Sequence, residues 1–226
     1  AGRVSGLWVY PVKSMRGHSL DVASIDVRGV EGDRLYAVRD TAGKIGSGKN
    51  TRRFARMDCV ARWAARICSA GVEVRPPDGD WIDGASQTAA ALLTVQVGRP
   101  VTLSREAEIQ HFDAAPIHLM TTGDLAMLER FAGVRPRVES FRPNLLVETE
   151  ERSGDWIGRR LRIGSVELEA IAPTERCLMV NVAPDGRPGF DFLRPVAQRM
   201  DACFGIYASV VEIGRVALCD SIELLD

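Results

Sequence analysis

The sequence predicts a β-rich α+β protein with a barrel-like architecture. Segments that alternate polar and apolar residues are short and are separated by glycine and proline, which is typical of strands joined by turns. Candidate helices are few and do not alternate one-to-one with strands, which argues against a doubly wound parallel sheet. With 226 residues, 46% of them hydrophobic and 26% charged, the chain can bury the core of one large domain or two small ones.

The first part of the chain consists mainly of predicted strands. Residues 43–49 are rich in glycine and lysine, and we interpret them as a tolerated loop insertion rather than as a mobile lid. Residues 57–68 are ambiguous, because their apolar residues fit a helical stripe while the segment is bounded like a strand. Strands are expected at residues 4–12, 23–27, 34–39 and 71–75.

Three helices are expected. Ser86 is a candidate N-cap for a helix that ends near residue 97, and Thr121 or Thr122 caps a second helix that runs to Phe131. A short third helix, over residues 192–204, has Pro195 near its first turn. The first helix marks a domain boundary and divides the chain into residues 1–97 and 98–226. Further strands are expected at residues 99–103, 144–147, 160–163, 166–171, 177–182, 206–213 and 222–225.

The charge balance argues against two classes of partner. The formal net charge is −1, so no global field attracts nucleic acid or an anionic membrane surface, and neither is expected as a partner. The longest uncharged apolar stretch, residues 88–98, is too short to span a bilayer. An anionic ligand must therefore be held by a local cluster of donors.

The cysteine pattern argues against a disulfide framework and a structural zinc site. The five cysteines are odd in number and include no C-x-x-C pair. A reducing cytoplasm is the simplest setting for such a chain. The plant-type iron–sulfur spacing is also absent, so the electrons for any redox reaction must come from another protein.

Cys177 differs from the other cysteines in its context. The polar turn Thr174–Arg176 precedes it, and an apolar segment that we interpret as a strand follows. A cysteine at such a junction, next to an arginine, is placed to be exposed and to act as a thiolate, which is the form that ligates a metal or attacks an electrophile. Free cysteines are more often simply buried, and the remaining four are interpreted as small core residues: Cys59, Cys68, Cys203 and Cys219.

Basic and polar residues recur at the ends of predicted strands. Each one alone is typical of a solvated turn. Together they predict an anion cradle if the fold brings them to one place, because arginine and lysine side chains suit phosphate groups. The positions are Lys13, Ser14, Arg34, Arg53, Arg142 and Asn144.

An ordered set of motifs resembles one protein family over nearly the whole chain. The motifs are similar to those of the molybdenum cofactor sulfurase C-terminal (MOSC) family with an N-terminal β-barrel extension, whose best-known members resemble the mitochondrial amidoxime-reducing component. They are Leu7–Ser14, Gly32–Arg34, Asp113–Ile117, Phe141–Leu145, Arg176–Leu178, Pro184–Gly186 and Phe204–Tyr207 with Gly214.

The resemblance implies a fold, a cofactor and a reaction. The fold would be a MOSC β-barrel core with an N-terminal β-barrel lobe and a cleft between them. The cofactor would be molybdenum bound to molybdopterin, with Cys177 as the metal ligand. The reaction would reduce N-hydroxylated or related N–O or S–O compounds, with electrons from an external ferredoxin-type or flavoprotein-type donor. Residues implied to contact the pterin or its phosphate are Lys13, Ser14, Arg34, Arg142 and Asn144, assisted by Arg53 and Arg176.

Two further expectations concern the proton donor and the positions at which this sequence departs from the family pattern. Loss of oxygen as water needs protons, and Asp113 or His111 is the candidate donor. Ala114 and Ala115 stand where relatives carry hydroxyl residues, and Glu175 adds a negative charge beside Arg176. The resemblance also favours a strand over residues 57–67.

Two other functions fit the same residues. Cys177 would carry a persulfide in a sulfur-transfer protein, which would receive sulfur because the chain lacks a pyridoxal-phosphate desulfurase domain. Alternatively, the chain would bind the molybdenum cofactor without catalysing a reaction. Trapping a persulfide on a metal-free protein would favour sulfur transfer, whereas failure to bind metal or pterin would favour a diverged member.

Overall fold

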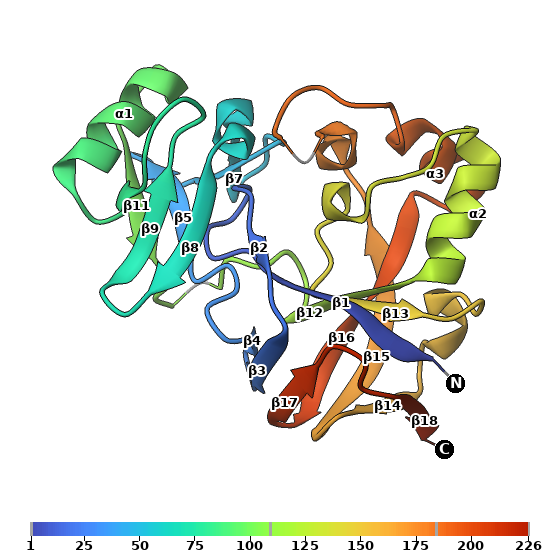
Figure 1. Ribbon diagram of the computed structural model, residues 1–226. Helices are drawn as coiled ribbons and strands as arrows, with labels where there is room; N and C mark the ends of the chain where they lie inside the picture. Colours follow the sequence, from blue (N-terminus) through green and yellow to red (C-terminus); the bar gives the residue numbers. More distant parts are fainter. Residues whose placement is uncertain (1, 109, 184, 226) are drawn as a thin grey trace.

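The computed structural model describes residues 2–108, 110–183 and 185–225, and the predicted β-rich α+β fold is confirmed. Figure 1 shows two lobes, one built around a large curved sheet and one built from smaller sheets. Pro184, which belongs to one of the family motifs, lies outside the described residues.

The C-terminal lobe is organised by an eight-stranded sheet. Strands β12 and β13 pair in parallel, and the other neighbours in the sheet run antiparallel. Its apolar inner face packs into one core that includes Leu119, Leu161 and Ile206. In sheet order, the strands are β18 (Ile222–Leu225), β14 (Arg160–Ile163), β15 (Val166–Glu175), β16 (Cys203–Glu212), β12 (Ile117–Thr121), β13 (Leu145–Glu148), β1 (Arg3–Val9) and β2 (His18–Ser19).

The first strand of the chain belongs to this C-terminal sheet. Leu7 of β1 lies opposite Leu145 of β13, and both side chains are buried in the core of the sheet. The chain then leaves this sheet at Tyr10 and crosses to the other lobe. A small neighbouring sheet also joins the two ends of the sequence. Its middle strand, β3 (Val22–Asp26), pairs with β17 (Gly214–Ala217) on one side and with β4 (Gly29–Val30) on the other.

The N-terminal lobe contains two smaller sheets and helix α1 (Gln87–Val97). Ser86 caps α1 by accepting a hydrogen bond from the Ala89 amide, and Gly98 ends the helix at a φ of 76°. Strand β11, which follows α1, pairs with β5 of this lobe. The strands are β5 (Tyr36–Asp40), β6 (Ile45–Ser47), β7 (Phe54–Arg56), β8 (Ala64–Cys68), β9 (Gly71–Arg75), β10 (Ile82–Asp83) and β11 (Val101–Arg105).

Helices α2 (Thr122–Ala132) and α3 (Leu193–Arg199) cover the outer side of the large sheet (Figure 1). Thr121 is the N-cap of α2 and forms a capping box with Asp124, as its position before an apolar periodic segment predicted. The helices pack on the sheet through a core that includes Met120, Leu128, Val196 and Phe204.

Local structure differs from the prediction in four segments. The third helix is shorter than the predicted 192–204, because α3 ends at Arg199 and β16 begins at Cys203. Residues 57–67 are not one strand: a 3₁₀ helix, η1 (Asp58–Arg62), precedes β8, which explains the mixed apolar pattern. The predicted strand over residues 177–182 is the 3₁₀ helix η4 (Leu178–Asn181). The segment interpreted as a loop insertion contains strand β6, which is buried and pairs with both β5 and β7. Two further 3₁₀ turns are η2 (Val138–Ser140) and η3 (Ser153–Trp156).

The prediction that four cysteines are core residues is wrong. Cys59, Cys68 and Cys203 are only partly buried, and Cys219 is exposed. Cys219 lies in a turn with a φ of 70°, which places its side chain at the surface rather than in the adjacent sheet. Burial alone therefore does not separate Cys177 from the other cysteines.

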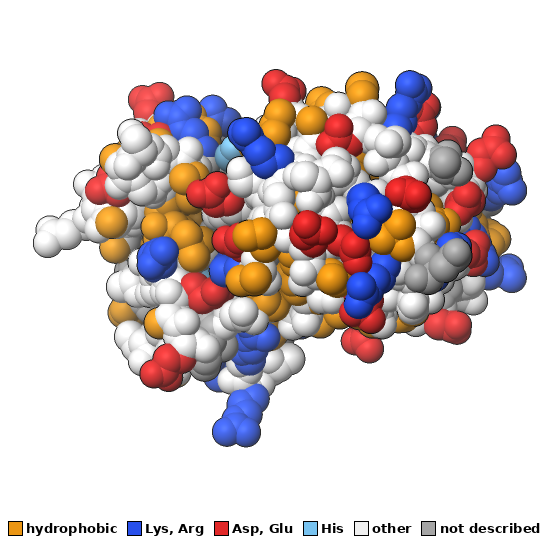
Figure 2. Space-filling view, turned by 90° about the horizontal axis from the view of Figure 1, so that it is seen from below, with side chains coloured by type: hydrophobic (Ala, Val, Ile, Leu, Met, Phe, Trp, Pro, Cys, Tyr) orange, Lys and Arg blue, Asp and Glu red, His pale blue; other side chains and the backbone are white. Residues whose placement is uncertain are grey.

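Acidic and basic side chains are interspersed on the face of the molecule seen in Figure 2, in keeping with the formal net charge of −1. In the part of the chain that the structure describes, no helix has the length and apolar character needed to cross a membrane.

Candidate functional site

A cavity of about 610 Å³ receives side chains from both lobes. The basic, polar and sulfur-containing residues predicted from strand ends and motifs line it, with Arg53 as the exception. The structure thus brings together residues that lie more than a hundred positions apart in the sequence. The predicted residues in this lining are Lys13, Ser14, Arg34, Asp113, Arg142, Asn144, Arg176 and Cys177.

Backbone pairing explains why Lys13 and Arg34 converge. The Tyr10 amide donates to Oδ1 of Asp33 over 2.8 Å, and the Arg34 amide donates to the Tyr10 carbonyl over 2.8 Å. The Lys13 amide then donates to the Tyr36 carbonyl, also over 2.8 Å. The segment that leaves β1 is therefore fixed against the segment that enters β5.

Asn144 fixes the opposite side of the cavity. Its side chain is 1% exposed, its Oδ1 accepts from the His118 amide at 3.1 Å, and its Nδ2 donates to the Trp8 carbonyl at 3.4 Å. Oδ1 also accepts from Arg34 at 3.3 Å. Asn144 thus lines the cavity while its amide group holds β1, β12 and the Arg34 side chain in place.

Three of the lining residues have left-handed backbone conformations. Ser14, Arg34 and Arg142 have φ values of 68°, 47° and 57°, which side-chain-bearing residues rarely adopt. Each such conformation costs on the order of 1–3 kcal/mol and persists only where the surrounding structure imposes it. Its recurrence at three positions around one cavity indicates that the fold is strained in order to orient these side chains.

Arg34 and Arg142 both lie on the ring of Tyr10. Their guanidinium carbons are 4.8 and 4.3 Å from the ring centroid. Arg34 is paired with the Asp33 carboxylate and donates to the Arg142 carbonyl over 3.1 Å. Arg142 donates to the Met15 carbonyl over 2.6 Å. Aromatic and carbonyl contacts thus keep two partly buried cations side by side.

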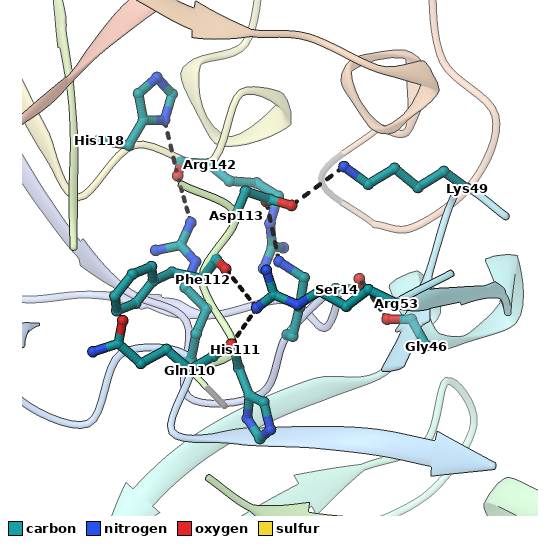
Figure 3. A network of polar contacts seen from close by, with 12 residues as sticks. Ser14, Gly46, Lys49, Arg53, Gln110, His111, Phe112, Asp113, His118 and Arg142 are labelled. Carbon is teal, nitrogen blue, oxygen red and sulfur yellow. Dashed lines mark hydrogen bonds and ion pairs between the residues drawn. The ribbon is translucent and has the colours of Figure 1, made fainter. Parts of the chain in front are cut away.

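Asp113 bridges two lysines at the mouth of the cavity. Its carboxylate oxygens lie 3.0 Å from Nζ of Lys13 and 3.4 Å from Nζ of Lys49. The Asp113 side chain is 46% exposed because solvent reaches the mouth, whereas that of Lys13 is 6% exposed. Although burial by the surrounding protein opposes ionisation, Lys13 and Lys49 hold the pKa of Asp113 well below its usual range. Figure 3 shows Asp113 directed toward Lys49.

The charges in this cluster make Lys13, and not the predicted Asp113, the residue that can donate a proton. Asp113 is ionised at neutral pH and has no proton to give, so its predicted role as proton donor is not supported. Burial, only partly offset by Asp113, lowers the pKa of Lys13 to about 8. Lys13 is therefore the member of the pair that carries a transferable proton near neutral pH.

His111, the alternative proton donor, does not line the cavity. It is fully buried, its amide donates to Glu106 over 2.6 Å, and its Nε2 lies 2.9 Å from the Arg39 guanidinium. Burial and Arg39 lower the pKa of His111 to about 4, so its ring is neutral. The structure therefore gives His111 a packing role.

Arg53 supports the cavity from outside. Its guanidinium donates to the carbonyls of Gln110 and Phe112, the latter over 3.0 Å, as Figure 3 shows. These contacts hold the loop that carries Asp113. Arg53 was predicted to assist in anion binding, but it does not line the cavity, and its Nη2 donates to the backbone of this loop.

Cys177 lies where β15 ends and η4 begins. Its backbone is extended, and its carbonyl accepts from the Val180 amide at 3.1 Å, which starts the 3₁₀ turn. The side chain is partly buried and faces the cavity lining. The neighbouring Arg176 directs its guanidinium to the Phe141 carbonyl, 2.7 Å away, and not to Glu175.

The sequence did not identify His118 and Tyr207, which also line the cavity. His118 is 5% exposed; its Nδ1 lies 3.4 Å from the Arg142 carbonyl and its Nε2 lies 3.5 Å from Arg176. A neutral ring protonated on Nδ1 satisfies both contacts, and burial together with Arg176 holds the pKa of His118 well below its usual range. Burial raises the pKa of Tyr207 to about 12, so its hydroxyl is a donor. The sequence signal that could have identified His118 is its position within the apolar run Ile117–Met120.

The lining has the chemistry of an anion site. Five basic side chains and two acidic ones line it, which leaves the cavity positive. No carboxylate of residues 2–108, 110–183 or 185–225 forms an ion pair with the partly buried Arg142 or Arg176. Nε of Arg176 and Oγ1 of Thr174 are buried and lack a hydrogen-bond partner within the same ranges. Unpaired buried cations and donors are costly unless a ligand satisfies them.

The donor set fits an anionic pterin cofactor. Arg142, Arg176, Thr174 and Lys13 would satisfy a phosphate or polar ring edges, and the Cys177 sulfur would be the soft ligand for the metal. Ala114 and Ala115 do line the cavity, so they offer this ligand no side-chain hydrogen bond. Glu175 lines it as well but leaves Arg176 free to face the cavity.

Comparisons with known proteins agree with this architecture. Among curated proteins, mitochondrial amidoxime reducing component 2 from Bos taurus is 24% identical, with coverage of 98% of this chain and 82% of the relative. The human protein of the same name is 23% identical, with coverage of 98% and 83%. A solved structure, the YUAD protein from Bacillus subtilis, has the same fold, with a TM-score of 0.55, 16% identity and coverage of 99% of this chain and 94% of that protein.

Two family models together span the chain. The model described as the MOSC N-terminal beta barrel domain matches residues 1–114, and the model described as the MOSC domain matches residues 106–223. The match of the second model includes the β15–η4 junction that carries Cys177, and the match of the first includes Lys13 and Arg34. The resemblance seen in the motifs is confirmed, and the chain belongs to the MOSC domain family, with a MOSC N-terminal β-barrel domain preceding the MOSC domain.

Proposed function

We propose that this protein is a molybdenum-cofactor-dependent reductase of small molecules that contain an N–O bond. MOSC domains are associated with molybdenum cofactor binding, and the relatives at nearly full coverage are named amidoxime reducing components. The observation that carries the proposal is that Cys177 lines a positively charged cavity in which Arg142 and Arg176 form no ion pair with a carboxylate of the described residues. S–O compounds belong to the same proposal as a second substrate class.

The residues divide into two groups around the proposed cofactor. Cys177 would hold the metal through Sγ. The residues that would bind the pterin or its phosphate are Lys13, Ser14, Arg142, Thr174 and Arg176. Arg34 and Asn144 orient Arg142 and β12. When bound, the cofactor would supply the redox-active metal.

The reaction needs protons as well as electrons. Reduction of an amidoxime to an amidine breaks the N–O bond, consumes two electrons and two protons, and releases water. Lys13 Nζ is placed to donate a proton at the mouth of the cavity, and Asp113 holds that ammonium group in position over 3.0 Å. The electrons would come from an external ferredoxin-type or flavoprotein-type donor.

The domain boundary and the compartment also belong to the proposal. We place the boundary after α1, between residues 97 and 98, although β11 remains paired with β5 and the two family matches overlap at residues 106–114. A cytoplasmic location is proposed from the cysteine pattern, whereas the relatives are named as mitochondrial proteins.

The test is a reductase assay on protein produced in a host that makes the cofactor. Benzamidoxime would be the substrate and dithionite-reduced methyl viologen the electron donor. We expect benzamidine formation by the wild-type chain and by the Cys59→Ala control, which alters a cysteine outside the cavity. Cys177→Ala should lose the activity. Equal rates in the two variants would contradict the proposal, and a metal-free protein with a persulfide on Cys177 would indicate sulfur transfer instead.

A further inference from the structure

A second cavity, of about 780 Å³, shares a wall with the first. Ser14, Arg142 and Met179 line both cavities, so they form the partition between them. Its other walls come from β1, β2, η1 and β8, on the side away from Cys177. None of the functions considered above uses this second cavity.

Four arginines and one glutamate, Glu139, line the second cavity, so its lining is positive overall. Arg16, Arg75 and Arg142 line it, and none of them forms an ion pair with a carboxylate in the part of the chain that is described. Arg66 also lines it but is paired with Glu73 at 2.6 Å. Burial, and then the charge of Arg75, lower the pKa of Arg16, which shows that the two guanidinium groups repel each other.

Aromatic rings line the same cavity and already stack with these cations. The guanidinium carbons of Arg66 and Arg75 lie 4.3 and 5.1 Å from the ring of Trp81, and that of Arg142 lies 4.3 Å from the ring of Tyr10. Tyr10 is 3% exposed and already carries Arg34 and Arg142, whereas Trp81 is partly exposed, so Trp81 is the ring that can accept another planar group by stacking.

Unsatisfied polar atoms mark the cavity as a binding site. The Tyr10 hydroxyl, Nδ1 of His18 and Nε of Arg16 are buried and have no hydrogen-bond partner among the described residues. All three side chains line this cavity. Burying such groups without partners is unfavourable, so a polar ligand that reaches them recovers free energy.

From the rings, the unpaired arginines and the unsatisfied donors together, we propose that the second cavity binds a small planar aromatic molecule that carries one anionic group. The ring stacks with Trp81, and the anion lies against Arg16 and Arg75. The binding does not require the molybdenum cofactor, so it stands or falls independently of the proposed reductase activity.

Calorimetric titration of the full chain with naphthalene-2-sulfonate tests the proposal, because this probe joins a planar ring to a permanent anion. We expect saturable binding at one site. Naphthalene-2-sulfonamide, which has nearly the same shape without the charge, should bind about tenfold more weakly, because a hydrogen bond to a charged group contributes more than one to a neutral group. Absence of saturable binding, or equal affinity for the two probes, would overturn the proposal.

Variants assign the binding to the second cavity. Arg75→Gln, at an exposed position, and Trp81→Ala should each weaken binding about fivefold, the effect of losing roughly 1 kcal/mol of ionic or stacking interaction. Arg105→Gln is the matched control, because it removes the same charge from a strand of the same lobe outside both cavities. Lys49→Gln alters only the first cavity and should leave the affinity unchanged. Weakening by Lys49→Gln, or equal affinity in the Arg75 and Arg105 variants, would contradict the assignment.

Discussion

The Lys13 ammonium group donates a hydrogen bond over 3.0 Å to Oδ2 of Asp113, a residue one hundred positions further along the chain. Lys13 follows the strand that belongs to the C-terminal sheet, and Asp113 lies in the segment between β11 and β12. The pair therefore ties together the two segments that connect the lobes, directly beside the cavity. The stability that this pair contributes to the fold and the protonation of Lys13 both lead to measurable predictions.

Asp113→Asn should destabilise the protein by about 1–2 kcal/mol at pH 7, a value reduced from that of a fully buried pair because the carboxylate is 46% exposed. The loss arises because Lys13 remains buried and charged without its partner. The folded pKa of Lys13, about 8, lies below its ordinary value of 10.5. Above pH 8 the folded protein releases this proton, the ion pair disappears, and the difference between variant and wild type should shrink.

Urea denaturation at pH 7 and pH 9.5 measures this difference. Lys49→Gln is a useful comparison, because Lys49 is 37% exposed at 3.4 Å from the same carboxylate and should contribute less. An Asp113→Asn effect that does not change between the two pH values would contradict the assigned protonation.

Binding of a small anion in the first cavity should weaken as the pH rises through about 8. Protonated Lys13 attracts the anion, and the neutral amine above this pH does not. Sulfate is a suitable probe because its own charge is constant in this range, and its binding can be measured as stabilisation against thermal unfolding. Lys13→Arg keeps the charge at high pH and should remove the inflection. A wild-type curve that matches that of Lys13→Arg would refute the prediction.

His118 should remain neutral between pH 8 and pH 5.5. Burial and the Arg176 guanidinium hold its pKa well below the usual range. Proton NMR of the imidazole C–H signals should therefore show no titration of His118 in this interval. Arg176→Gln removes one of the three causes, which are burial, Arg176 and Arg34, and should move the pKa of His118 upward. An ordinary titration of His118 in the wild-type protein would contradict the described contacts.

Ser14→Gly should be more stable than Ser14→Ala by about 1 kcal/mol, since glycine tolerates the φ of 68° that the fold imposes and alanine does not. Both variants lose the hydrogen bond from the Ser14 hydroxyl to the Gly46 carbonyl, which Figure 3 shows, so their comparison isolates the backbone strain. Equilibrium unfolding of the two variants measures the difference. Equal stability would show that the left-handed conformation is not strained.

Much of the fold and the site could be predicted because single residues carry local signals. Ser86 and Thr121 are helix N-caps in the structure as predicted. Lys13 and Arg142 lie beside strands within recognisable motifs, and the structure brings them to one cavity. Their convergence depends on the pairing of β1 with β13, which is a long-range contact that local patterns do not report.

Other features could not be read from the sequence. Lys49 lies in a glycine-rich segment that resembles an insertion, and its contact with Asp113 exists only in the folded chain. Tyr207 resembles an ordinary strand residue, and His118 a packed one. The 3₁₀ turn after Cys177 has the composition of a strand, and its geometry follows from contacts of Val180 with Phe141 and Phe192 in a shared core.

The central claim is that Cys177 ligates a metal held with a pterin in the first cavity. Molybdenum analysis and pterin fluorescence on the same samples, purified from a cofactor-producing host, test it most directly. The wild-type chain and Cys59→Ala should each contain about one molybdenum and one pterin per chain. Cys177→Ala should lose the molybdenum, and Arg142→Gln should lose much of the pterin. Full molybdenum occupancy in Cys177→Ala would contradict the claim.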